Sequence, residues 1–212
     1  MSDMKLLPVV KNPSRNTSDS QTYIGARGTR DGVQFAADYL ENLAMQGRIF
    51  VANMGTVTTP LTFLVTAANR PDAWIRVPTG TTIYPLSVNV ILESAAGTVT
   101  EIDVRAAQND IGSGTSSAAS VGPLPTRTDA PITSLCTARQ LATGDTTAET
   151  NPVSLYRRTY ARADEAGIDF RGIEAIRSIL GYPILVGPAT LEVFIAGTGT
   201  QATGYVVVTW AE

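Results

Sequence analysis

The chain has 212 residues, of which 43% are hydrophobic and only 17% are charged, and its net charge is −3. This length fits one domain, and the slight negative charge argues against a protein whose whole surface binds nucleic acid. The chain contains no histidine, which excludes a Ser-His-Asp triad and zinc sites made of histidine and cysteine.

Residues 1–30 are expected to form an extended N-terminal arm. They show little hydrophobic periodicity, and their basic side chains outnumber Asp3 and Asp19. These basic residues are Lys5, Lys11, Arg15, Arg27 and Arg30. Two interpretations remain open. The arm is a loosely docked terminus, or its apolar stretches LLPVV and TYIG help it to reach a neighbouring subunit or an anionic surface.

A helix is predicted next, over about residues 34–46. Phe35, Tyr39, Leu40 and Leu43 recur at helical spacing, and Gly47 provides a stop. The alternative for this segment is a strand that continues into the sequence RIFVAN.

From residue 48 onwards the sequence consists of short runs rich in Val, Ile, Thr, Tyr and Phe, separated by Gly, Pro, Asn and Asp. The predicted strands are 48–53, 61–66, 73–77, 82–93, 98–107, 132–140, 153–161, 190–197 and 204–212. This pattern predicts a mainly β fold, an antiparallel β-sandwich of jelly-roll type with about eight or nine strands and one or two short helices. Residues 31–212 would form this single domain.

Alternation within the strands predicts which side chains face the core. Ile102 and Val104 should face it, while Glu101, Asp103 and Arg105 should form a wet face. Trp74, Trp210 and the single cysteine, Cys136, are expected to be core residues, and one cysteine excludes an internal disulfide.

The closing stretch LEVFIAGTGTQATGYVVVTWAE predicts a hairpin. Residues 190–197 and 204–211 should pair antiparallel around Gly197–Gly204. The run VVVTW is apolar on both faces, so this strand should lie inside its sheet with both faces covered.

Two segments interrupt the strands. The Gly-, Ser- and Pro-rich stretch 109–131 is predicted to be an exposed or partner-bound loop. Apolar residues at helical spacing predict a short helix at about 172–180.

Two clusters could carry chemistry. Asp164, Glu165, Asp169 and Glu174 form the densest acidic group, interpreted as a solvated lead into the second helix, with a calcium site or a glycosidase-like pair as alternatives. Arg157, Arg158 and Arg162 alternate with tyrosines and are expected to form ion pairs within or between subunits. A nucleic-acid groove is the alternative for these arginines. No cofactor motif or membrane span is found, and we expect no cofactor, metal or catalytic residue.

The run AWIRVPTGTTIYPLSVNVILESAAGTVTEIDVRAA, together with the closing stretch, resembles virion structural proteins with jelly-roll folds, such as capsid and decoration (cement) proteins of bacteriophages and other viruses. The resemblance covers residues 47–212 and is one of texture. It implies a non-enzymatic protein located in the virion, which self-assembles as a homo-oligomer, with a trimer favoured, and contacts other capsid proteins.

The partners of such a protein would contact its arm and its basic strand. The candidate residues are Lys5, Lys11, Arg15, Arg27, Arg30, Arg157, Arg158 and Arg162. The alternative function is a carbohydrate- or receptor-binding module of a phage tail or spike, in which Trp74, Tyr84 or Tyr182 would be exposed. An enzyme that uses the acidic group is the third hypothesis.

Overall fold

The computed structural model describes residues 10–11, 23–24, 43–56, 58–64, 70–94, 99–112, 119–129, 131–141, 146–161, 183–197 and 199–212. The chain divides into two compact units, Met1–Asn42 and Leu43–Glu212. In the first unit, β1 (Val10–Lys11) pairs antiparallel with β2 (Tyr23–Ile24). These two short strands are the described part of the expected arm.

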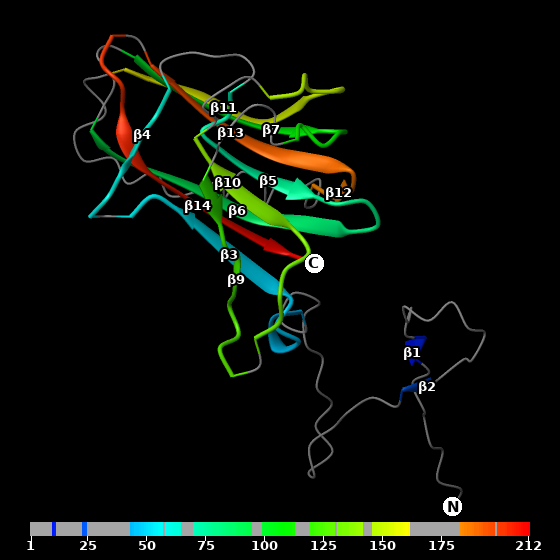
Figure 1. The fold of residues 1–212 in the computed structure, drawn as a ribbon. Coiled ribbons are helices and arrows are strands. Elements are labelled where there is room, and N and C mark those ends of the chain that lie inside the picture. The colour runs from blue at the N-terminus through cyan, green and yellow to red at the C-terminus, as the bar shows by residue number, and fades with distance from the viewer. Residues whose placement is uncertain are drawn as a thin grey trace, which may run out of the picture. The chain divides into compact units, whose positions relative to one another are not determined.

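The second unit contains two six-stranded antiparallel sheets (Figure 1). Sheet I contains, in spatial order, β11 (Val153–Ala161), β7 (Val99–Ala107), β13 (Ala189–Gly197), β5 (Ala73–Val77), β10 (Thr137–Gln140) and β8 (Ala119–Val121). Sheet II contains β12 (Leu185–Val186), β6 (Thr82–Ser94), β14 (Thr203–Ala211), β3 (Ile49–Met54) and β9 (Leu124–Pro125), with β4 (Leu61–Thr62) also paired to β14. The mainly β, antiparallel prediction is confirmed.

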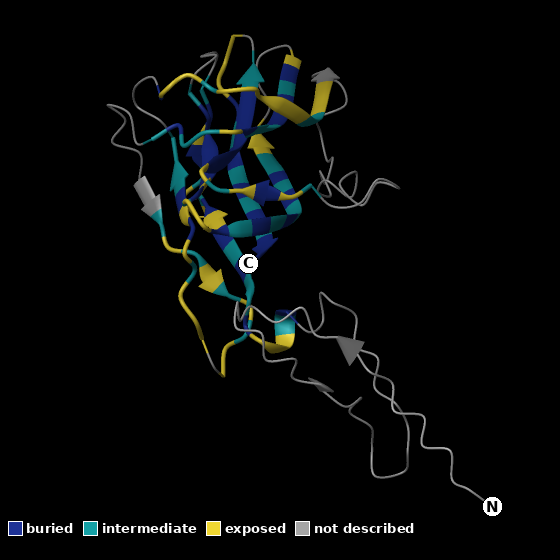
Figure 2. Cartoon of the chain, turned by 90° about the vertical axis from the view of Figure 1, so that its right-hand side faces the viewer, coloured by how far each residue is buried: buried dark blue, intermediate teal, exposed yellow. Residues whose placement is uncertain are grey.

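The hydrophobic core lies between the two sheets. In strands such as β14, buried and half-buried residues alternate, which gives the dark and lighter bands along the strands in Figure 2. Ile102 and Val104 of sheet I join Val206, Val208 and Trp210 of sheet II in one buried cluster. Burying such side chains stabilises the fold by about 1.5–3 kcal/mol each. The core predictions for Trp210 and Cys136 are confirmed, and the ring of Trp210 stacks on a second core aromatic ring.

The predicted closing hairpin is wrong, because β13 and β14 belong to different sheets. β13 pairs with β5 and β7, and β14 pairs with β3, β4 and β6. Each of the two strands has a row of apolar side chains. Such rows are buried as well when the strands face each other across a sandwich as when they pair side by side in one sheet. The connection is held by contacts distant in sequence: Ala202 is buried, and its carbonyl oxygen accepts a hydrogen bond of 2.9 Å from the N–H of Phe63.

The prediction that β14 lies inside its sheet is confirmed, since β6 and β3 flank it. Its second face is less covered than predicted. Val206 and Val208 are fully buried, whereas Val207 and Thr209, on the other face, are half-buried. A half-covered face tolerates apolar side chains because single exposed hydrophobic groups are common on protein surfaces.

A helix ends where the sequence predicts one. Leu43–Met45 are helical, and Gly47 has a φ of +71°, a conformation that glycine adopts without strain. The N–H of Gly47 and that of Arg48 donate to the carbonyl oxygens of Ala44 and Leu43, which closes the last turn. The rest of the predicted helix over 34–46, and the helix at 172–180, lie outside the described residues. No helix in the described part of the chain is long and apolar enough to span a bilayer.

The loop predicted at 109–131 is partly structured, which corrects the prediction. It contains β8 and β9, which form the last strand of sheet I and of sheet II respectively. Both strands are only two or three residues long. A run this short shows too few alternations for sequence to distinguish it from a loop.

The side chain of Glu212 fastens the segment before β10 to the end of β14. Its carboxylate accepts hydrogen bonds from the hydroxyl of Ser134, from the N–H of Leu135 at 3.1 Å and from the indole Nε1–H of Trp210 at 3.1 Å. Burial and this carboxylate together raise the pKa of the Cys136 thiol. The thiol is therefore a neutral core group.

We expect Glu212→Ala to lower the free energy of unfolding by about 2 kcal/mol, because the buried indole N–H and two loop groups lose their acceptor. Equilibrium urea denaturation measures this change. In the Trp210→Phe background, which has no indole N–H, the same substitution should cost about 1 kcal/mol less. Equal costs in both backgrounds would contradict the role given to the indole bond.

Candidate interaction surface

Exposed apolar side chains lie on the outermost strands of both sheets. β11 and β8 are the edges of sheet I, and β12 and β9 are the edges of sheet II. Val153 of β11, Val186 of β12 and Leu124 of β9 are each more than half exposed. An unpaired strand edge with apolar side chains favours pairing with another chain.

Exposed apolar residues concentrate at one end of sheet II, where β9, the loop after it and the helical turn at 43–47 lie (Figure 1). We define the apolar end as Met45, Leu124, Ile132 and Leu135, which are 67%, 59%, 43% and 68% exposed. They come from the helical turn at 43–47, from β9, and from the stretch 131–135 that precedes β10.

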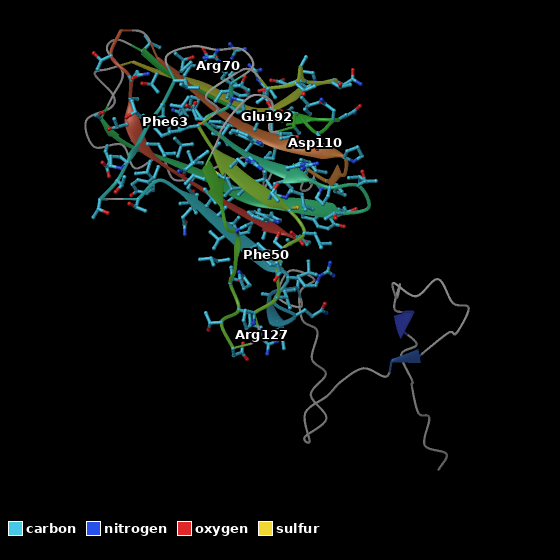
Figure 3. The ribbon with its side chains drawn as sticks, in the orientation of Figure 1. Phe50, Phe63, Arg70, Asp110, Arg127 and Glu192 are labelled. Atoms are coloured by element: carbon cyan, nitrogen blue, oxygen red, sulfur yellow. The ribbon has the colours of Figure 1, made fainter. Side chains whose placement is uncertain are left out.

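Strand pairing and hydrogen bonds position Leu124, Met45 and Leu135. Leu124 pairs with Val51 in the β9–β3 ladder. Arg127, after β9, donates a hydrogen bond to the carbonyl oxygen of Met45, and Figure 3 shows Arg127 at this end of the domain. Leu135 is held by Glu212, as described above. The apolar side chains are therefore presented on a fixed backbone.

Charged groups at the apolar end pair with one another. The guanidinium of Arg127 forms a two-pronged ion pair with Asp129, with Nε–Oδ1 and Nη2–Oδ2 distances of 2.7 and 2.9 Å. Glu212 turns towards its buried donors. The Arg127–Asp129 pair is thus neutral as a whole, which lowers the cost of covering it with another apolar surface, whereas the donors of Glu212 carry no charge.

The predicted basic cluster lies in part on β11, an edge strand of nine residues. Arg157 forms an ion pair with Glu101 of β7, so the expected ion pairing is confirmed for this residue. Arg158, the next residue along the strand, is exposed on the other face. Arg162 lies outside the described residues, as do the side chains of all the basic residues predicted in the arm: Lys5, Lys11, Arg15, Arg27 and Arg30.

A buried charged cluster lies on the outer face of sheet I, where the sequence predicted a wet face. Asp103 is buried, which corrects the prediction. Its carboxylate accepts hydrogen bonds of 2.7 Å from Arg105 Nε and from the hydroxyl of Ser154. Arg105 Nη1 also lies 3.2 Å from the carboxylate of Glu149, and its guanidinium stacks over the ring of Phe194 at 4.5 Å.

Glu192 of β13 belongs to the same cluster and was not among the predicted site residues. It is 1% exposed, and neither carboxyl oxygen has a hydrogen-bond donor among the described groups. Burial first, and then the carboxyl of Glu149, raise its pKa to about 9, while Arg105 acts in the opposite direction. The available signal was a lone glutamate within the apolar run TLEVFIAG, on a strand whose partners the sequence did not reveal.

The described residues give little support to the alternative functions, a carbohydrate-binding module or an enzyme, or to a calcium site. Trp74 is buried and packs against Ile111, so it confirms the burial prediction and cannot stack on a sugar. Asp164, Glu165, Asp169, Glu174 and Tyr182 lie outside the described residues. Within the described ranges, no group of three or more His, Cys, Asp or Glu side chains could hold a metal ion.

Comparison with known proteins finds no matching family model, no similar curated protein and no similar solved structure.

Proposed function

We propose that this chain is a non-enzymatic structural subunit with a jelly-roll fold, which assembles with copies of itself into a virion component. The strand order supports the jelly-roll assignment. If β3, β5, β6, β7, β11, β12, β13 and β14 are numbered one to eight, sheet II reads 1-8-3-6 and sheet I reads 2-7-4-5. Among these eight strands, each consecutive pair lies in different sheets except β7 and β11, while β4, β8, β9 and β10 are additional short strands. This is the order of two interlocked Greek keys, which occurs in viral capsid proteins and lectins.

The composition and the burial of the charged cluster support a non-enzymatic role. The chain lacks histidine, the commonest general base. The carboxyls of Glu149 and Glu192 are both at least nine-tenths buried, so a substrate could not reach them. The described residues thus offer stable packing and exposed edges instead of an open catalytic centre.

The apolar end is the observation that carries the assembly proposal. Met45, Leu124, Ile132 and Leu135 place large apolar side chains in water on a rigid backbone. A second copy of the chain is the partner that the surface fits best, because its own apolar end offers the same exposed apolar side chains. Symmetric contacts of this kind are isologous, and further edges such as β11 and β12 would then extend the assembly to other copies.

The test is the oligomeric state measured by size-exclusion chromatography with light scattering. We expect the wild-type chain to be an oligomer. The double variant Leu124→Lys/Leu135→Lys should have a dissociation constant about 100-fold higher, so that it becomes monomeric at concentrations at which the wild type stays assembled. Each of the two substituted positions should cost at least about 1.4 kcal/mol of association free energy, a tenfold change in dissociation constant, and the two together about 100-fold. Both wild-type side chains are exposed, so the variant should fold normally, which circular dichroism checks.

The matched control is Val153→Lys, an exposed valine on the β11 edge. It should leave intact the oligomer that forms through the apolar end. A wild-type chain that stays monomeric at high concentration contradicts the proposed function. Dissociation by Val153→Lys alone would instead move the contact to the β11 edge and overturn the role of the apolar end.

A further inference from the structure

Two covering segments close the outer face of sheet I over the buried charged cluster. Residues 108–112 and 146–151 bond to each other: the N–H of Gln108 donates to the carbonyl of Thr150 at 2.9 Å, and that of Thr147 donates to the carbonyl of Ile111 at 2.9 Å. The hydroxyl of Thr190 in β13 bonds both the N–H of Ile111 and the carbonyl of Asn109. Glu149 therefore reaches the cluster from a segment that is anchored on the sheet.

Negative charge exceeds positive charge in this cluster if all its carboxyls are ionised. Asp103 and Glu149 form ion pairs with one guanidinium, that of Arg105, and Glu192 lies directly opposite Arg105 in the β13–β7 ladder. Arg105 donates its Nε to Asp103 and its Nη1 to Glu149. Glu192 is thus left without a donor in a place with almost no water, where an isolated carboxylate is costly.

We propose that Glu192 and Glu149 share one proton, which Glu192 carries and donates to the Glu149 carboxylate, and that this proton latches the segment 146–151 onto β13. The shared proton removes the excess negative charge and gives Glu192 a hydrogen-bond partner. Two carboxyls that lie close together hold one proton strongly, because like charges disfavour the ionisation of both. The raised pKa of Glu192 agrees with this arrangement. The inference is independent of the proposed function.

Most other charged groups on this face have partners outside the cluster. Among the described residues they are Glu101, Arg157, Arg76, Asp110 and Arg139. Glu101 pairs with Arg157, and Arg76 pairs with Asp110. Arg139 lies on β10, beyond Trp74 of β5 in the ladder that leads to Glu192. Asp72 turns its carboxyl to the backbone N–H groups of Leu64 and Ile195. Arg105 therefore remains the cation that acts on Glu192.

The test compares the wild-type chain with Glu192→Gln, whose amide can donate to Glu149 but does not titrate. For the wild-type chain, the unfolding equilibrium constant should rise about tenfold more between pH 7 and pH 8 than for the variant, because folded Glu192 keeps a proton that unfolded Glu192 has released. Denaturant titrations at both pH values give these constants. Staying at or below about pH 8 limits ionisation of the unfolded Cys136 thiol, and the remaining ionisation is common to both chains.

Two spectroscopic measurements separate the latch from a general effect on stability. Carbon-13 NMR of the glutamate carboxyls should show one signal that titrates with a midpoint near pH 9. This signal should be absent in Glu192→Gln, and its midpoint should move to lower pH in Glu149→Gln. Amide protection of Thr147 and Thr150, corrected for intrinsic exchange, should fall above this midpoint in the wild-type chain only.

The control variant Glu93→Gln changes an exposed glutamate of β6 and should behave as the wild type. A Glu192 signal that titrates below about pH 6, near the ordinary glutamate range, overturns the proposal. If millimolar calcium chloride at pH 7 stabilises the wild-type chain but not Glu192→Gln, the carboxyls hold a cation, and the shared proton is rejected.

Discussion

Replacing Gly204 by alanine should lower the free energy of unfolding by about 3 kcal/mol or more. Gly204 begins the long pairing of β14 with β6, next to an irregularity in the register. An added Cβ atom would lie 2.0 Å from the carbonyl oxygen of Ile91 and 3.0 Å from the Cα of Leu92. Both are backbone atoms in the middle of sheet II, so relief of the clash requires the two strands to separate. Urea denaturation of the purified variant measures the loss.

Gly122→Ala is the matched control for this prediction. A Cβ atom at Gly122 meets nothing within 4 Å. The same chemical change there should alter stability by less than about 0.5 kcal/mol. If the two alanine variants are equally stable, the close approach of β14 and β6 at Gly204 is wrong.

Asp72→Ala should lower the free energy of unfolding by about 3 kcal/mol at pH 5. Asp72 is buried just before β5, and its carboxyl oxygens accept the backbone N–H of Leu64 at 2.8 Å and that of Ile195 at 2.7 Å. The substitution leaves both N–H groups without an acceptor. It thereby loosens the segment after β4 from β13, across the two sheets.

The cost of Asp72→Ala should shrink as pH rises. Burial raises the pKa of Asp72 to about 7, although its two backbone hydrogen bonds act in the opposite direction. Between about pH 4 and pH 7 the folded chain therefore holds a proton that the unfolded chain has released. The stability due to this proton is fully present below about pH 4 and is lost as pH rises through about 7.

Between pH 5 and pH 8 the difference between wild type and Asp72→Ala should fall by about 3 kcal/mol, since two pH units of one proton correspond to about 100-fold in the unfolding constant. Asp72→Asn, which keeps an acceptor oxygen but does not titrate, should be less destabilising at pH 5. A cost of Asp72→Ala that does not change with pH would show that Asp72 is ionised throughout.

Glu192 contributes to the same pH dependence over a wider range. Its pKa is raised to about 9, so its share of stability falls from about pH 4.5 up to about pH 9. Below pH 7 the two acids act together, and above pH 7 Glu192 acts nearly alone. Comparison of the Asp72 and Glu192 variants over both pH ranges therefore separates the contribution of the Asp72 hydrogen bonds to the backbone from that of the Glu192–Glu149 pair.

Alternation of apolar and polar residues was sufficient to place the core-facing side chains. Ile102 and Val104 were correctly predicted to face the core because side chains of a strand alternate whatever the strand pairs with. The same rule failed for Asp103, since it shows which side a residue occupies but not what covers that side. Segments 108–112 and 146–151 cover it, and they bond to one another over a long sequence separation.

The candidate surfaces were harder to predict than the core. Arg157 could be proposed as an ion-pair residue from its neighbours in sequence, but its partner Glu101 was set by the register of β11 on β7. The apolar end could not be predicted because Met45 is about 80 residues before Leu124, Ile132 and Leu135 in the sequence, and only the fold brings these segments to one end. Each of these residues by itself resembles an ordinary core or loop residue.

The sequence by itself determined a β-rich chain with buried alternate residues, a helical turn that ends at Gly47, and no histidine chemistry. These properties follow from local geometry and composition. Only the tertiary structure decided that β13 and β14 lie in opposite sheets, and that Glu192 meets Glu149 and Arg105. Strand pairing and burial depend on which distant segments come together. Burying the apolar side chains of β13 and β14 stabilises the fold by nearly the same amount whether the two strands are neighbours in one sheet or lie in opposite sheets. The closing stretch is therefore a crossing between two sheets, and one glutamate within it is buried beside a second acid.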